Sequence, residues 1–299
     1  MDERPPCADV SRNHDEPLSG TASRVRNWLL VEQDGTWGQE AVSESGLRPE
    51  IAARLKREAA RNHIRLLLIK RSDGADTGKF RCFAGHSGVD AQWVQRLPVG
   101  GVDDVLDIDL TPLRAGTRLD LGEPWPDPLY LVCTNGAHDP CCDRLGAPAA
   151  RGLARARPAE TWESSHVGGD RFAANLVCLP HGLYFGRVDA DAAVEVAALY
   201  ESGLIHLDHY RGRSCFEPVV QAADIFIRTR EELLGIDDLE PTWRRDREGG
   251  RSTLGFRDCF GEEHEVEVAV RRGAARPITC SAAHPGAPRE YHVFDADDD

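Results

Sequence analysis

The sequence predicts a mixed α/β protein of two blocks, followed by a β-rich C-terminal extension. Short apolar runs alternate with segments whose apolar residues recur every three or four positions, which favours alternating strands and helices. Three prolines fall within the five positions from Pro124 to Pro128 and break this alternation near the middle of the chain. Beyond Gly235 the pattern changes to strand-like runs separated by turn residues.

The composition is that of a folded, water-soluble protein. A length of 299 residues with 41% hydrophobic side chains suits two domains of ordinary size. The formal net charge of −14 disfavours general binding to nucleic acids or to anionic membranes. The apolar runs are far shorter than a membrane-spanning helix, and the acidic N-terminus does not resemble a signal peptide. We therefore expect a cytoplasmic protein with no nucleic-acid or membrane partner.

The first part of the chain divides into a leader and an α/β block. Residues 1–24 are polar and contain several prolines, which predicts an irregular leader. The block that follows spans residues 25–122. Its expected elements are strands at 28–32, 64–70, 79–84 and 105–109, and a helix at 49–62.

The second block spans residues 128–235 and has a more informative order of elements. We expect strands at 129–133, 160–164, 176–179 and 183–188, helices at 142–157, 191–202 and 218–234, and one or two helical turns at 171–175. Up to residue 202 this order is β-α-β-α-β-β-α, the order of a thioredoxin-like domain. The extension, residues 236–299, is expected to contain a hairpin at 253–257 and 265–271, an edge strand at 291–294 and an acidic tail.

Two loops of the second block carry candidate metal ligands among the nine cysteines of the chain. Cys133 ends one predicted strand, and Cys142 begins the helix after it. His166 and Asp170 follow the next strand, four positions apart and separated by two glycines. If the two strands are parallel neighbours, both loops meet at one edge of the sheet, where ligands collect in α/β folds.

The types of donor side chain limit the kinds of site that the loops can form, but they do not decide between zinc and an iron–sulfur cluster. Neither loop has the Cys-x-x-Cys pairs of zinc ribbons or of dithiol oxidoreductases. Thiolate and imidazole donors suit zinc, and they equally suit a [2Fe–2S] cluster in which His replaces Cys on one iron. A further hypothesis is a thiol-dependent enzyme that uses Cys141 or Cys142 as nucleophile.

At these residues the chain resembles the sucrase/ferredoxin-like family. The resemblance rests on Cys133-x8-Cys142, on Ser165-His166-x-Gly-Gly-x-Arg171-Phe-Ala and on Leu179-Pro-x-Gly-x-Tyr184-x-Gly186-Arg. Further matches are Arg211-Gly-Arg-Ser-Cys215 and, in the leader, Pro17-Leu-x-Gly-Thr-Ala22. The resemblance extends over roughly residues 7 to 230 and implies a thioredoxin-like [2Fe–2S] ferredoxin domain in the second block. Because the leader shares these motifs, we expect residues 17–22 to pack onto a folded domain.

The resemblance also implies a set of ligands. In characterised fungal members two Cys hold one iron and two His hold the other. By position, Cys133 and Cys142 form the Cys pair and His166 is the first His. Asp170 stands where the second His is expected, so either it ligates through oxygen or a nearby residue replaces it. The nearby candidates are Cys178, Cys141 and His138.

The function implied by the resemblance is one-electron transfer to an unknown redox partner protein, generically a flavin reductase or another redox protein. The protein would then be an electron carrier rather than an enzyme with its own substrate. The alternatives are a structural zinc-binding scaffold protein and a thiol-dependent redox enzyme.

Overall fold

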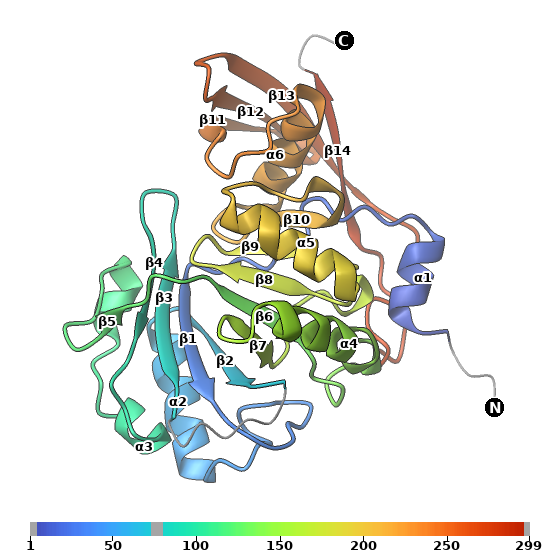
Figure 1. Cartoon of the computed structure of the whole chain (residues 1–299). Coiled ribbons are helices and arrows are strands. Elements are labelled where there is room, and N and C mark those ends of the chain that lie inside the picture. Colours follow the sequence, from blue (N-terminus) through green and yellow to red (C-terminus); the bar gives the residue numbers. More distant parts are fainter. Residues whose placement is uncertain (1–4, 73–79, 296–299) are drawn as a thin grey trace.

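The computed structural model describes residues 5–72 and 80–295, which form two β-sheets with helices packed on them (Figure 1). The first half contains α1 (Cys7–Asn13), β1 (Asn27–Glu32), α2 (Pro49–Arg61), β2 (Ile64–Lys70), β3 (Cys82–Ser87), β4 (Gln92–Arg96), α3 (Val102–Val105), the 3-10 turn η1 (Thr111–Ala115) and β5 (Glu123–Pro124). Among the described residues, no helix combines the length and the apolar character that crossing a membrane requires.

The middle of the chain supplies the elements that carry the predicted ligands. These are β6 (Leu129–Cys133), α4 (Pro140–Ala156), β7 (Thr161–Ser164), η2 (Asp170–Phe172), β8 (Leu176–Leu179), β9 (Leu183–Phe185), α5 (Ala190–Glu201), η3 (Leu207–His209) and β10 (Tyr210–Arg213). The last part consists of α6 (Pro218–Glu231), β11 (Leu239–Arg247), η4 (Glu248–Gly250), β12 (Arg251–Asp258), β13 (Glu263–Arg272) and β14 (Arg289–Asp295).

The predicted α/β class is confirmed, and the two predicted blocks share one sheet. The larger sheet has ten strands in the order β10-β9-β8-β6-β7-β2-β1-β3-β4-β5. β7 belongs to the second block and pairs antiparallel with β2 of the first, through Ile69 with Ser164 and Lys70 with Glu163. Strands β11 to β14 form a separate antiparallel sheet, as the β-rich extension predicted. The acidic tail at 296–299 lies outside the described residues.

Helix α4 is the element that connects the core to the ligand loops. Asp139 caps its N-terminus by accepting a hydrogen bond from the Cys141 amide, and Pro140 occupies the first helical position. Its buried face packs on β6 beside α5 (Figure 1). Gly146 lies so close to β6 that a Cβ atom there would be 2.0 Å from the Cys133 carbonyl oxygen. The start of α4 and the end of β6 are therefore held in fixed positions relative to each other.

Three predictions for the first half need correction. The leader is not irregular throughout, because residues 7–13 form α1, which buries Cys7, Ala8 and Ser11. The strand expected at 105–109 is wrong: the short helix α3 ends at Val105, and turns follow. Gly101 and two aspartates in the first turn favour a helix start there. The strand expected at 79–84 begins instead at Cys82 and continues to Ser87, and Lys79 lies outside the described residues.

The packing expected for residues 17–22 is confirmed. The Thr21 amide donates a hydrogen bond of 3.2 Å to the Arg211 carbonyl oxygen. The Ala22 amide donates to the Gln221 side chain at 3.1 Å. Glu16, only 3% exposed, accepts a hydrogen bond of 2.7 Å from Arg171 Nε in η2. The leader is thus built into the folded body of the protein by buried polar contacts.

Replacing Glu16 with Ala is expected to lower the free energy of unfolding by about 3–5 kcal/mol, the usual cost of breaking a buried ion pair. The substitution removes the partner of Arg171 and of Arg276, whose Nη1 lies 3.9 Å from Glu16 Oε2. Urea denaturation followed by circular dichroism measures the change. The matched control is Glu263→Ala in the exposed pair with Arg257, for which a loss of about 0–1 kcal/mol is expected. Equal losses in the two variants would contradict the role assigned to Glu16.

Candidate metal centre

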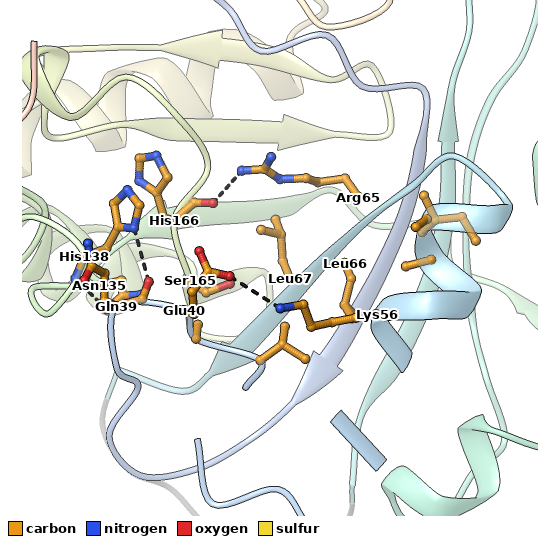
Figure 2. Close-up of a pocket in the computed structure, with 15 residues that line it drawn as sticks. Gln39, Glu40, Lys56, Arg65, Leu66, Leu67, Asn135, His138, Ser165 and His166 are labelled. Atoms are coloured by element: carbon orange, nitrogen blue, oxygen red, sulfur yellow. Dashed lines mark hydrogen bonds and ion pairs between the residues drawn. The ribbon is translucent and has the colours of Figure 1, made fainter. Parts of the chain in front are cut away.

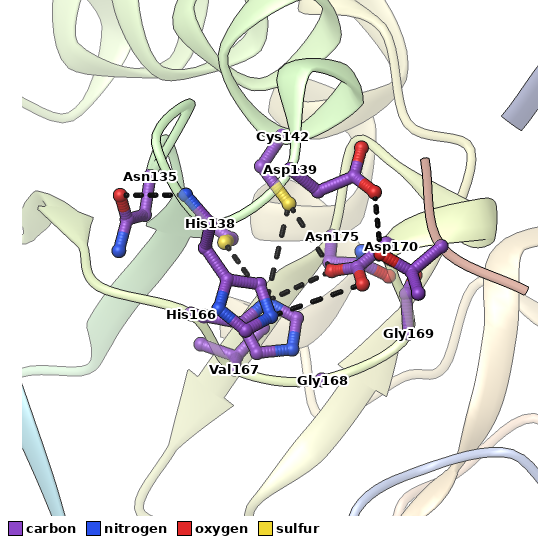
Figure 3. Close-up of polar contacts among 12 residues, drawn as sticks. Asn135, His138, Asp139, Cys142, His166, Val167, Gly168, Gly169, Asp170 and Asn175 are labelled. Carbon is purple, nitrogen blue, oxygen red and sulfur yellow. Dashed lines mark hydrogen bonds and ion pairs between the residues drawn. The ribbon is translucent and has the colours of Figure 1, made fainter. Parts of the chain in front are cut away.

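The two ligand-bearing loops meet at one edge of the larger sheet, as expected from the sequence. Strands β6 and β7 are parallel neighbours, with Cys133 opposite Ser164 in the register. The loop after β6 leads into α4, and the loop after β7 leads into η2. Figure 3 shows side chains from both loops converging beneath the first turn of α4.

All four predicted ligand residues lie together. His166 Nδ1 is 3.9 Å from Cys133 Sγ and 3.9 Å from Cys142 Sγ. It is also 3.0 Å from Asp170 Oδ1, which lies 3.5 Å from Cys142 Sγ. Both thiols are buried, at 1% exposure for Cys133 and 0% for Cys142. The spacing of the two motifs therefore brings two sulfur donors, one nitrogen donor and one oxygen donor into one buried cluster.

His138 also belongs to this site. Its ring stacks on that of His166, with centroids 3.8 Å apart, and its Nε2 is 3.9 Å from Asp170 Oδ2 (Figure 3). The donor atoms form two overlapping groups, each with all members within 4.8 Å: Cys133, Cys142 and His166, and His138, His166 and Asp170. His166 is common to both. The site can thus offer two thiols and one carboxylate that are buried, together with two half-buried imidazoles.

The other two candidates for the fourth ligand lie elsewhere. Cys178 is fully buried in β8, opposite Tyr130, and is in neither donor group. Cys141 follows the capping residue of α4, but its sulfur contacts Cys7 at 3.8 Å and Cys280 at 3.6 Å instead. Among the residues named from the sequence, Asp170 and His138 are therefore the two placed to complete a ligand set with His166.

The electrostatics of the site favour the thiolate form at one of its two cysteines. A hydrogen bond from Cys142, reinforced by His166, holds the pKa of Cys133 well below its usual value despite burial. The pKa of Cys142 is raised, first by that hydrogen bond and then by burial. Burial opposes charge on His166, but Cys133 and Asp170 outweigh it and raise its pKa. A thiolate, the form that binds metals, is therefore favoured at Cys133.

The loop that carries His166 is held in place by residues that are not among the four predicted ligands. Gly168 and Gly169 have φ of 108° and 87°, values that side-chain-bearing residues rarely adopt. A Cβ at Gly169 would meet the Arg211 guanidinium at 2.3 Å. Arg211, buried to 1% exposure, donates to the Gly168 carbonyl at 3.1 Å and to Asn175 Oδ1 at 2.6 Å. Glycine at position 169 allows the buried cation to lie directly behind the ligand loop, and glycine at position 168 leaves room for Ser23.

Arg65 in β2 holds the same loop from the first half of the chain. Its Nη2 donates a hydrogen bond of 2.6 Å to the His166 carbonyl oxygen. Sequence reasoning gave Arg65 no role, and no local pattern around it indicates one. Arg211 lies in a motif that supported the family resemblance, but its contact with the glycine loop was not foreseen.

A cavity of about 400 Å³ lies next to the two imidazoles of the site (Figure 2). His138 and His166 line it together with Gln39, Glu40 and Lys56, and neither Cys133 nor Cys142 does. The Lys56 ammonium lies 3.6 Å from Glu40 Oε2 across this cavity. Small molecules or side chains of a partner can therefore approach the imidazoles, while protein surrounds the thiols.

The comparison with known proteins gives one result. The family model described as sucrase/ferredoxin-like matches residues 18–212, which is more than half of the chain and contains every residue of the candidate centre. No curated protein and no solved structure gives a significant match.

Proposed function

The chain belongs to the sucrase/ferredoxin-like family, and from this premise we propose that it is an electron-transfer protein that holds a [2Fe–2S] cluster. Cys133 and Cys142 would hold the inner iron, and His166 and Asp170 would hold the outer one. The cluster would accept and release one electron at a time. The chain itself would position the ligands, exclude water from the thiolates and leave the imidazole side open to a partner.

One observation carries this proposal: the donors are segregated. Two buried thiols come from the β6–α4 connection, while the imidazoles of His138 and His166 line the cavity and the carboxylate of Asp170 lies next to both rings. A two-iron centre with mixed ligands uses sulfur on one metal and nitrogen or oxygen on the other. The order β6-α4-β7-η2-β8-β9-α5 also supports a thioredoxin-like ferredoxin domain.

The redox partner would approach the face where the cavity opens. Electron exchange becomes slower as the donor and acceptor move apart, and the imidazoles are the ligands that face the cavity. A protein partner, such as a flavin-containing reductase, would dock over His138 and His166. Lys56→Ala should leave the spectrum unchanged while altering the rate of reduction by such a partner.

The test is anaerobic purification followed by iron, sulfide and zinc analysis with visible absorption spectra. Two irons and two sulfides per chain with visible colour are expected. A colourless protein without sulfide after reconstitution under reducing conditions would contradict the proposal.

A single zinc ion is the second candidate function, and one observation favours it. The sulfurs of Cys133 and Cys142 and one nitrogen of His166 all lie within 4.8 Å of one another, so they can meet on one ion. A two-iron centre requires more separation between the thiols and His166 than 3.9 Å, because the two sets bind different irons. Metal analysis that finds one zinc and no sulfide per chain, with the zinc lost when Cys133 is replaced, would support this structural role.

Replacing Asp170 with His is expected to raise the midpoint potential. With two thiolates and two neutral imidazoles, the oxidised cluster carries no net charge, and a carboxylate in place of one imidazole adds one negative charge. A more negative site accepts an electron less readily. The native potential should therefore lie between those of plant-type ferredoxins, about −400 mV, and of Rieske centres, about −150 to +300 mV. Redox titration of the native and Asp170→His proteins measures the difference.

Two alanine variants test whether Asp170 or His138 is the fourth ligand. If Asp170 is the ligand, Asp170→Ala changes both spectrum and potential, whereas His138→Ala leaves the cluster in place. An unchanged spectrum and potential in Asp170→Ala, with loss of the cluster in His138→Ala, would assign the position to His138.

A further inference from the structure

A second cluster of thiols lies beside the first turn of α4, on a side separate from the candidate centre. It contains the sulfurs of Cys7, Cys141 and Cys280 and the carboxylate of Asp139, and all four ligand atoms lie within 4.8 Å of one another. Cys7 begins α1, Cys141 lies in α4, and Cys280 lies in the connection between β13 and β14. In Figure 1 this connection runs past α1 beside α4. Three distant parts of the chain thus each bring one cysteine to the same point.

We propose that Cys7, Cys141, Cys280 and Asp139 form a closed, structural zinc site that ties the N-terminal helix and the C-terminal extension to α4. The proposal is independent of the electron-transfer function, because it uses none of the residues assigned to the candidate cluster.

The distances between the sulfurs suit one tetrahedral ion. Cys141 Sγ lies 3.8 Å from Cys7 Sγ and 3.6 Å from Cys280 Sγ. Zinc–sulfur bonds of about 2.3 Å at tetrahedral angles place neighbouring thiolates about 3.8 Å apart. Cys7 Sγ is 3.8 Å from Asp139 Oδ1, which suits an oxygen donor on the same ion. The four donors can therefore bind one zinc with little movement.

The surroundings of the sulfurs also suit thiolates. The Cys7 amide donates a hydrogen bond to Cys280 Sγ at 3.3 Å, and the Ala8 amide donates one to Cys141 Sγ. Backbone N–H groups aimed at sulfur stabilise its anionic form, as in the outer shell of metal sites. Cys141 also lies in the first turn of α4, where the helix dipole favours negative charge. Cys7 and Cys141 are buried, so water reaches the sulfurs mainly beside Cys280.

Asp139 is held ready as the fourth ligand. Its Oδ2 accepts hydrogen bonds from the Cys280 amide at 2.6 Å and the Thr279 hydroxyl at 2.8 Å. Its Oδ1 accepts from the Cys141 amide at 2.8 Å, which leaves one lone pair of that oxygen for a metal. Carboxylate ligands of metals are themselves commonly hydrogen-bonded in this way.

A disulfide explains the cluster less well. A disulfide bond is about 2.05 Å long, so any pair of these sulfurs would have to approach by more than 1 Å. It would also use two of the three thiols and leave the third without a role. A single metal ion uses all three together with the carboxylate.

The central experiment measures zinc per chain in the full-length protein, purified under reducing conditions after zinc supplementation. Native protein and the Cys259→Ser control, which changes an exposed cysteine, should retain this zinc. Cys280→Ser and Cys7→Ser should each lose one zinc equivalent per chain. Retention of that equivalent in Cys280→Ser would overturn the proposal, as would a native protein that binds no zinc.

The Cys133→Ser chain separates this site from the candidate cluster. It should keep the zinc equivalent that Cys280→Ser loses, whatever its iron content. If Cys280→Ser and Cys7→Ser fail to fold, Co²⁺ added to metal-free Cys133→Ser protein provides a second test. A thiolate-to-cobalt charge-transfer band that zinc abolishes is expected. Absence of this band, or a Cys141–Cys280 disulfide found by mass spectrometry of the zinc-treated reduced protein, would refute the site.

Discussion

Replacing Cys133 or Cys142 with Ser is expected to remove the visible absorbance of the purified protein completely. Both sulfurs lie in the same donor group with His166, and both are buried. A serine hydroxyl is a poor ligand for ferric iron, and burial prevents an outside ligand from replacing the lost thiolate. Iron and sulfide analysis together with absorption spectra of the anaerobically purified variants checks this expectation.

Two further cysteines provide controls. Cys82 is buried in β3, pairs with β1 and lies in none of the donor groups formed by the described residues, so Cys82→Ser should keep its colour. Cys280→Ser should keep it as well, because that sulfur belongs to the second cluster. A Cys133→Ser protein with its full complement of iron and sulfide would refute the ligand assignment.

Replacing Gly146 with Ala is expected to disrupt the centre without altering any ligand. The new methyl group would lie 2.0 Å from the Cys133 carbonyl oxygen, a backbone atom that cannot turn away. Helix α4 must then move away from β6 and carry Cys142 away from Cys133. Overpacking of this kind costs about 1–3 kcal/mol, occasionally more. We expect a lower melting temperature and loss of most bound iron.

Gly101→Ala is the matched control for this substitution. A Cβ at Gly101 has no neighbouring atom within 4 Å, and its backbone φ of −171° suits alanine. Its iron content and melting temperature should equal those of the native protein. Native iron content in Gly146→Ala would show that contact between α4 and β6 does not control the geometry of the centre.

The sequence predicts best those features that local patterns encode. The run Ile64–Lys70 is a strand over the predicted residues, and most of its apolar side chains are buried, three of them in succession from Leu67 to Ile69. The meeting of the two loops was predicted correctly because each loop follows a strand and the two strands are parallel neighbours. His166 and Asp170 approach to 3.0 Å because their loop turns at the two glycines between them.

Features that depend on distant residues were not predictable in the same way. Helix α1 follows two prolines within a polar leader, and its buried face finds partners in η2 and α4. Arg65 supports the His166 loop from a strand of the other block, and its neighbours in sequence give no sign of this. The cluster of Cys7, Cys141 and Cys280 spans 273 positions of chain, so no spacing rule could reveal it.

The position of the leader has a consequence for biosynthesis. Arg211 donates hydrogen bonds to Thr21 across 190 positions, and Arg276 reaches Glu16 from the C-terminal extension. A ribosome delivers the leader well before these two arginines, at about 5–20 residues per second. Until Cys141 and Arg171 have emerged, the leader has no native partner for Cys7 or for the buried carboxylate of Glu16. The leader therefore emerges well before the segments that supply its last native contacts.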